Sequence, residues 1–213
     1  MRAKAIIVFL LMAASGVVAF AVRPDFGVRV GMDLSAPSRH DIYKVGAGAE
    51  VGAFGTFHFA RNFFFEPGLV GFYNTMSANE DIEINGYYYE GSASTFGLRI
   101  PLSVGYELPL QDGMVIGFAT GPWVNFNLSA RQNILPNFGA PVPVPDQTIN
   151  LFKHGWKRVD ALWGFSLSMK FSGHYYVGVS GGVAFTPLAR FGVKDKVIRV
   201  HRNTVAVSLG YVF

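Results

Sequence analysis

The stretch TVAVSLGYVF, from Thr204 to Phe213, ends the chain and alternates between two kinds of side chain. Large apolar residues alternate with small or polar ones, with Val212 as the single exception. A period of two is the period of a β-strand that has two unlike faces. Chain ends usually fray, so an apolar strand that reaches the last residue predicts that this segment pairs with another strand.

Seven further segments alternate in the same way, at residues 26–35, 43–59, 63–76, 96–108, 116–128, 159–171 and 175–185. Three of the connections between the eight segments are tight: 60–62, 109–113 and 172–174. Four are long: 36–42, 77–94, 130–157 and 188–203. Because short and long connections alternate strictly, we expect up-and-down antiparallel strands with short turns at one end and long loops at the other. That pattern is typical of an outer-membrane β-barrel.

The composition fits an apolar, folded protein. Of the 213 residues, 50% are hydrophobic and only 15% are charged, and the formal net charge is +4. This excludes a disordered chain. Cysteine is absent, which excludes disulfides, thiolate metal sites and a thiol nucleophile.

The first residues, MRAKAIIVFLLMAASGVVAFA, have the pattern of a secretory signal peptide. Arg2 and Lys4 are basic, residues 6–14 are apolar, and the small-residue site predicts cleavage after Ala21. A single membrane anchor is the alternative, but the apolar stretch is short for a span. We therefore expect a signal peptide at 1–21 and one β-barrel domain at 22–213.

Alternation alone also fits a soluble eight-stranded barrel of the lipocalin type. However, the apolar faces of the eight segments carry no charged residue, and the other faces are mostly Gly, Ala and Ser. The apolar faces are therefore expected to meet lipid, and the small residues to crowd the interior. We predict an all-β, eight-stranded antiparallel transmembrane barrel in the bacterial outer membrane, with both termini periplasmic. Its C-terminal residues Leu209, Tyr211 and Phe213 resemble the signal read by the outer-membrane assembly machinery.

Three motifs resemble the outer-membrane β-barrel domain of the PorT-like type, which is common in Bacteroidetes. They are FGVRVGMDLS (26–35), RIPLSVGYEL (99–108) and GFATGPWVNFNLSA (117–130), and DALWGFSLSMKFSGHYYVGVSGGVAFTPLA (160–189) is similar to the family's closing hairpin. The resemblance implies the fold. The PorT branch is tied to a secretion system and gliding, which is one possible role for this chain.

Charged residues on the inward faces are expected to pair with one another, because a buried charge without a partner is costly. The predicted lumen network comprises Arg29, Asp33, Lys44, Glu50, Glu66, Arg99, Glu107, Asp160 and Lys170. If the first two strands pair with Leu34 opposite Tyr43, Asp33 lies opposite Lys44, and Arg29 reaches Glu50 on the diagonal. Eight strands leave an interior just wide enough for side chains, so we expect a closed lumen.

No pattern predicts catalysis, a metal site or a cofactor. His40, His154 and His201 fall in long loops without metal-ligand spacing. A basic stretch is expected to form an outer rim near lipopolysaccharide phosphates rather than to bind nucleic acid; its residues are Lys194, Lys196, Arg199 and Arg202. We expect a non-enzymatic structural or binding role, with outer-membrane lipid, lipopolysaccharide, the assembly machinery and an extracellular loop partner as contacts. Small-solute transport and lipid modification are the alternatives.

Overall fold

The computed structural model describes residues 24–39, 43–77, 82–84, 87–136, 147–193 and 196–213. The predicted signal peptide at 1–21 lies outside these residues. None of the helices among the described residues is long and apolar enough to cross a membrane.

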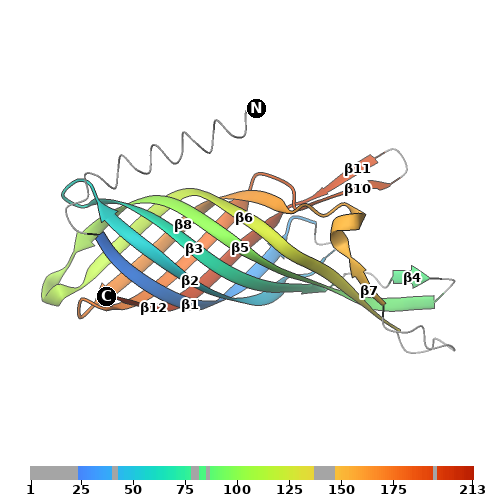
Figure 1. Cartoon of the computed structure of the whole chain (residues 1–213), viewed down its shortest axis with the longest axis horizontal. Helices are drawn as coiled ribbons and strands as arrows, with labels where there is room; N and C mark the ends of the chain where they lie inside the picture. Colours follow the sequence, from blue (N-terminus) through green and yellow to red (C-terminus); the bar gives the residue numbers. More distant parts are fainter. Residues whose placement is uncertain (1–23, 40–42, 78–81, 85–86, 137–146, 194–195) are drawn as a thin grey trace.

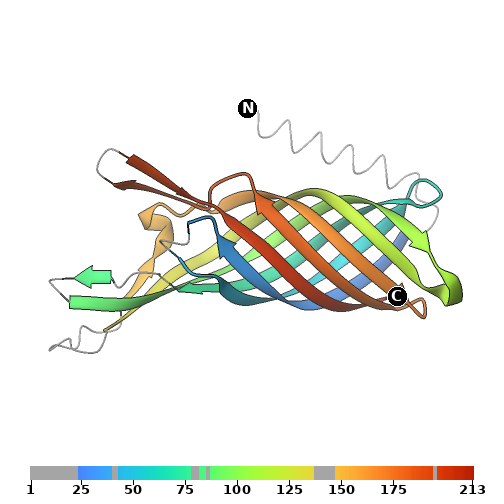
Figure 2. The same cartoon turned by 180° about the vertical axis from the view of Figure 1, so that it is seen from behind.

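Eight antiparallel strands close into a barrel (Figures 1 and 2). In barrel order they are β1 (Pro24–Pro37), β2 (Gly46–His58), β3 (Phe63–Ser77), β5 (Tyr87–Pro109), β6 (Val115–Pro136), β8 (Val159–Phe171), β9 (Tyr175–Ala184) and β12 (Arg202–Val212). Each strand pairs with the next, and β12 pairs with β1, from Gly27 opposite Val212 to Pro37 opposite Arg202. The predicted eight-stranded fold is confirmed.

The two ends of the barrel differ (Figure 1). At one end, called here the turn end, short connections join the strands and the C-terminus lies beside them; one of these connections is the short helix η1 (Gln111–Gly113). At the other, the hairpin end, short extra elements project beyond the barrel. They are β4 (Ile82–Ile84), β7 (Gln147–Asn150), η2 (Leu151–His154), β10 (Ala189–Val193) and β11 (Lys196–Val200).

Two strands are longer than the sequence predicted. β5 begins at Tyr87 rather than near 96, and β6 continues to Pro136 rather than 128. A register shift between Phe96 and Gly97 marks the point where the longer pairing starts. Beyond it, Ser92 to Thr95 still alternate between more and less exposed positions, but these small residues carry little hydrophobic signal. Parts of the predicted loops 77–94 and 130–157 are therefore ordered β-hairpin.

The outer wall is apolar, as predicted. The outward residues of β1 and β12 are large hydrophobic side chains that are more than a third exposed: Phe26, Val28, Val30, Met32, Leu34, Val205, Val207, Leu209 and Tyr211. Their neighbours in sequence point inward and are small or polar. In water such a surface would be unstable, whereas in a bilayer it meets acyl chains while every barrel strand keeps two paired edges.

The last strand joins the first along its whole length. The Phe213 amide donates to the Phe26 carbonyl at 2.8 Å, and the Tyr211 ring stacks on His174 with centroids 5.2 Å apart. Leu209, Tyr211 and Phe213 all face outward and are 59%, 40% and 73% exposed. The chain end is therefore held by the barrel closure itself.

Candidate functional site

Large side chains fill the barrel because glycines on neighbouring strands leave room for them. Phe72 and Trp123 point inward and are 1% and 3% exposed. A Cβ atom added at Gly97 would lie 2.7 Å from the Phe72 ring, and one added at Gly164 would overlap the Trp123 ring. Glycines on the inner faces thus leave the space that these aromatic rings occupy inside the barrel.

Arg99 on β5 is the centre of the polar interior. Its guanidinium donates to Glu50 on β2 at 3.0 Å and to the Asn125 side-chain oxygen on β6 at 3.1 Å. It also lies 5.2 Å from the ring centroids of both Phe72 and Trp123. A charge that is only 2% exposed needs such partners, because its hydration has been lost.

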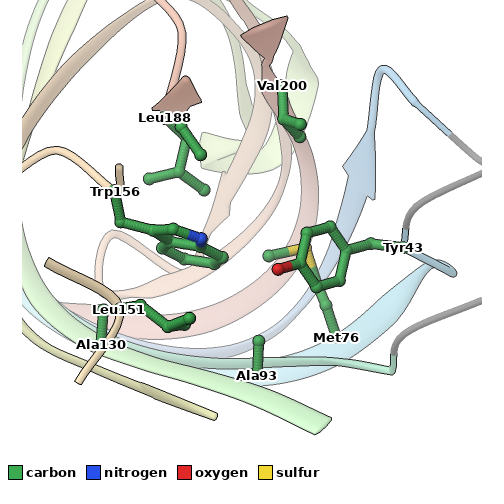
Figure 3. Close-up of a cluster of buried hydrophobic side chains, with 9 residues drawn as sticks. Tyr43, Met76, Ala93, Ala130, Leu151, Trp156, Leu188 and Val200 are labelled. Carbon is green, nitrogen blue, oxygen red and sulfur yellow. The ribbon is translucent and has the colours of Figure 1, made fainter. Parts of the chain in front are cut away.

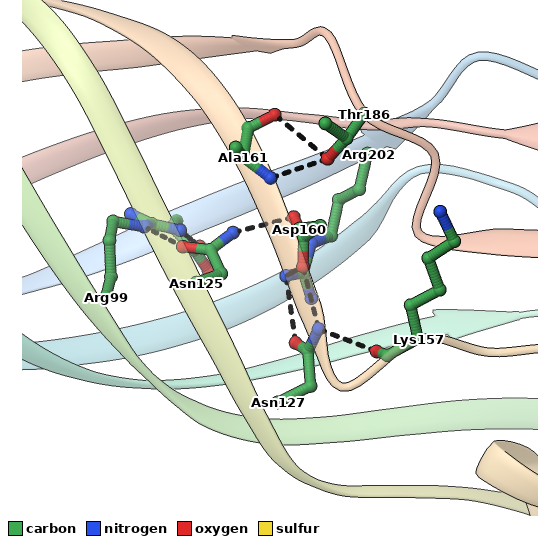
Figure 4. A network of polar contacts seen from close by, with 9 residues as sticks. Arg99, Asn125, Asn127, Lys157, Asp160, Ala161, Thr186 and Arg202 are labelled. Carbon is green, nitrogen blue, oxygen red and sulfur yellow. Dashed lines mark hydrogen bonds and ion pairs between the residues drawn. The ribbon is translucent and has the colours of Figure 1, made fainter. Parts of the chain in front are cut away.

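A second part of this network surrounds Asp160 on β8 (Figure 4). Its two carboxylate oxygens accept from Asn125 at 2.9 Å and from Asn127 at 2.7 Å. Arg202 on β12 reaches the same carboxylate at 3.4 Å and the Asn127 oxygen at 3.2 Å. Asn125 on β6 therefore links Arg99 on β5 to Asp160 on β8 along three adjacent strands.

Asp33 completes the network from β1. Its carboxylate accepts from the Asn74 amide on β3 and lies 3.9 Å from the Arg99 guanidinium. Gly48 on β2 is between Asp33 and Asn74 in the sheet, and a Cβ there would overlap both side chains. The missing side chain allows a bond that skips one strand. We call the whole set, each member at most 3% exposed, the central network: Asp33, Glu50, Asn74, Arg99, Asn125, Asn127, Asp160 and Arg202.

A smaller set of charges lies nearer the turn end. Glu107 accepts from Lys170 at 2.8 Å and contacts the His58 ring nitrogen at 2.8 Å. Glu66 accepts from Thr56 at 3.3 Å. The His58, Glu107 and Lys170 side chains are partly exposed, so water reaches them and each of their contacts contributes less than one in the central network.

Beyond the central network, an apolar cluster closes the hairpin end. We call it the cap; its buried members are Tyr43, Met76, Ala93, Ala130, Leu151, Trp156, Leu188, Ala189 and Val200. Figure 3 shows these side chains converging inside the curved wall of strands. The Tyr43 and Trp156 rings meet edge to face at 6.0 Å. Burial raises the pKa of the Tyr43 hydroxyl above its ordinary value, so the cap carries no charge at neutral pH.

Two predicted ion pairs were wrong. Asp33 lies opposite Gly48 rather than Lys44, because Tyr43 turns into the cap and β2 starts only at Gly46. Lys44 is exposed and outside the network. Glu50 pairs with Arg99 instead of Arg29. Arg29 still points inward: it is 8% exposed, and its guanidinium lies 5.9 Å from the ring centroid of Phe54.

The predicted basic rim needs one correction. Arg202 is 0% exposed and belongs to the central network. It lies two residues before Thr204 and four before Ala206 on β12, so its side chain points inward as theirs do. Arg199 is exposed on β11, and Lys196 begins that strand. Lys194 lies outside the described residues.

The loop histidines do not gather in the described part of the chain. His154 is exposed, His201 is half-buried, and His40 lies outside the described residues. Among the described residues, no three His, Asp or Glu side chains form a group that could hold a metal ion.

Several network members were missed by the sequence reasoning. Asn125 and Asn127 stand two apart on an inward face, and this polar pair inside an apolar strand was the available signal. Asn74 is likewise a polar residue on the inward face of its strand, β3. The cap had no such signal, since Leu151, Trp156 and Leu188 come from segments without periodicity.

Comparison with known proteins agrees with this architecture. The sequence profile of the family described as outer membrane protein beta-barrel domain matches residues 16–190. This chain belongs to that family. Membership places it in the bacterial outer membrane.

Solved outer-membrane barrels resemble the barrel domain at low identity. OprG from Pseudomonas aeruginosa is 13% identical with a TM-score of 0.47, over 89% of this chain and 95% of that one. Ail, the attachment invasion locus protein of Yersinia pestis, is 12% identical with a TM-score of 0.40, over 90% and 100%. Neisserial surface protein A is 8% identical with a TM-score of 0.40, over 89% and 97%. No curated protein sequence matches this chain.

Proposed function

We propose that this protein is a non-conducting outer-membrane barrel that presents a folded binding surface outside the cell. The observation that carries the proposal is the cap, packed over a lumen already filled by the central network. Ordered structure continues from the membrane wall into β5, β6 and the β10–β11 hairpin, which suits recognition rather than passage. The role is binding or structural rather than catalytic, with no cofactor.

The proposed orientation puts the hairpin end outside and both termini in the periplasm. Short turns on the periplasmic side and long extracellular loops are the usual arrangement of such barrels. Outer-membrane lipid surrounds the apolar wall, and the assembly machinery recognises Leu209, Tyr211 and Phe213. The motifs at 26–35, 99–108 and 117–130 resemble the PorT-like type common in Bacteroidetes, so a secretion-system component is an alternative role, although no residue of this chain selects that branch.

Transport of a small solute is the alternative. It would require a water path past Arg99, whose guanidinium lies 5.2 Å from both the Phe72 and the Trp123 ring centroid and pairs with Glu50 at 3.0 Å. Lipid modification would require a nucleophile and a base at one rim.

Single-cysteine labelling tests the proposal, because the chain has no cysteine of its own. Cysteine introduced at the exposed Lys153 should react with a membrane-impermeant maleimide on intact cells. Cysteine introduced at Asp112, exposed in η1 at the turn end, should react only after the outer membrane is opened. The reverse pattern would overturn the orientation. A pull-down from detergent-solubilised membranes, with loop-shaved cells as control, then identifies the partner.

A further inference from the structure

Two arginines lie side by side on the β10–β11 hairpin. Arg190 on β10 is directly opposite Arg199 on β11, and both are exposed. Directly opposed side chains in an antiparallel pair have Cβ atoms about 5 Å apart, and like charges there destabilise the strands. Neither guanidinium has an ion pair or a side-chain hydrogen bond within the described part of the chain. Among the described side chains, the hairpin therefore holds two positive charges together with no acidic partner.

A neighbouring segment brings further positive charge to this hairpin. The Arg190 amide donates to the Gly155 carbonyl at 2.9 Å, and the Lys157 amide donates to Leu188 at 2.8 Å, so residues 155–157 lie alongside β10. Lys153 and His154 precede this contact in η2 and are exposed. We call these four side chains the basic surface: Lys153, His154, Arg190 and Arg199.

No described acidic side chain balances the basic surface. Every carboxylate whose side chain is described lies inside the barrel or near the turn end: Asp25, Asp33, Glu50, Glu66, Glu107, Asp112 and Asp160. The opposite face of the hairpin is fixed, because Ala189 and Val200 are buried in the cap. The arginines are thus held outward on an anchored element.

We propose that the basic surface binds the phosphate groups of lipopolysaccharide, and that one phosphate bridges Arg190 and Arg199. Planar guanidinium groups suit bidentate contact with phosphate oxygens, and a shared anion removes the repulsion between them. This inference rests on the proposed function, which places the hairpin end at the outer leaflet. Lipopolysaccharide is the anion source that the leaflet itself supplies.

The test measures binding of purified lipopolysaccharide to the folded barrel in detergent micelles, at low and high salt. The variant R190Q/R199Q should bind about thirtyfold more weakly, since each cation near an anionic surface contributes roughly fivefold. R61Q, which removes an exposed arginine in a turn-end connection, should bind like wild type. Chemically dephosphorylated lipopolysaccharide should bind as weakly as the double variant does.

A second variant separates binding from folding. R199E places a carboxylate opposite Arg190, so it should raise or maintain the denaturation midpoint while it abolishes lipopolysaccharide binding. Wild-type affinity in R190Q/R199Q or R199E would overturn the proposal, as would equal binding of dephosphorylated lipopolysaccharide. Inorganic phosphate alone, binding as tightly as lipopolysaccharide, would also overturn it by showing a free-anion site. The assay does not depend on orientation in cells, so failure of the labelling test remains a separate result.

Discussion

Replacing Arg99 with methionine is the sharpest test of the polar interior. Methionine keeps an unbranched stem but lacks the guanidinium, so it loses the contact to Glu50 at 3.0 Å and the attraction to Asp33 at 3.9 Å. Both carboxylates are at most 1% exposed in their side chains, so water cannot replace the guanidinium. Removing one partner of a buried pair costs about 3–5 kcal/mol, and we expect R99M to lower the free energy of unfolding by that amount.

Equilibrium urea unfolding from lipid vesicles measures this loss. Trp123, which lies 5.2 Å from the Arg99 guanidinium, provides a local fluorescence signal, and gel mobility before and after heating reports the whole barrel. The double variant R99M/E50Q should recover part of the lost stability, because it also removes the buried Glu50 charge that R99M leaves without a partner. R61M, at an exposed turn, should change stability by no more than about 0.5 kcal/mol. A loss below about 1 kcal/mol in R99M, or simple additivity in the double variant, would refute the reasoning.

Three further changes test other parts of the barrel. Deleting Phe213, or replacing it with aspartate, should reduce the amount of heat-modifiable barrel in cell membranes, since its amide donates to Phe26 and its ring ends the proposed assembly signal; an undiminished amount of folded protein would speak against that signal. Gly48→Val should prevent folding, because a Cβ at this position would overlap the hydrogen-bonded side chains of Asp33 and Asn74. Gly71→Ala should fold, because its Cβ would have only one neighbouring atom, the Val51 carbonyl oxygen at 3.7 Å. Trp156→Ala should cost about 3–5 kcal/mol and make the hairpin end sensitive to protease, while an unchanged digestion pattern would mean that the cap is not packed.

The fold was predictable because alternation survives in every barrel strand. The same alternation would also have placed Arg202 inside, since it precedes the inward residue Thr204 by two positions on the strand. The register between β1 and β2 was not predictable, because it depends on where Tyr43 turns into the cap, and that turn leaves no periodic signal. The partner of Glu50 was not predictable for the same reason. It also depends on Arg99, which lies on a strand distant in sequence.

The cap shows a second limit of sequence reasoning. Six of its members come from three connections between barrel strands, and the other three, Met76, Ala93 and Ala130, come from the ends of β3, β5 and β6. Such contacts are defined only when the barrel brings the connections together. The basic surface has the same origin, because Arg190 and Arg199 become neighbours only through the hairpin register.

The most direct test of the central claim is conductance of the purified, refolded protein in planar lipid bilayers. A barrel filled by the central network and closed by the cap should give no steady ohmic current at either polarity. R99M should also stay silent if Phe72 and Trp123 block the same section. A reproducible stepwise current from the wild-type protein would contradict the closed lumen and make solute transport the better account.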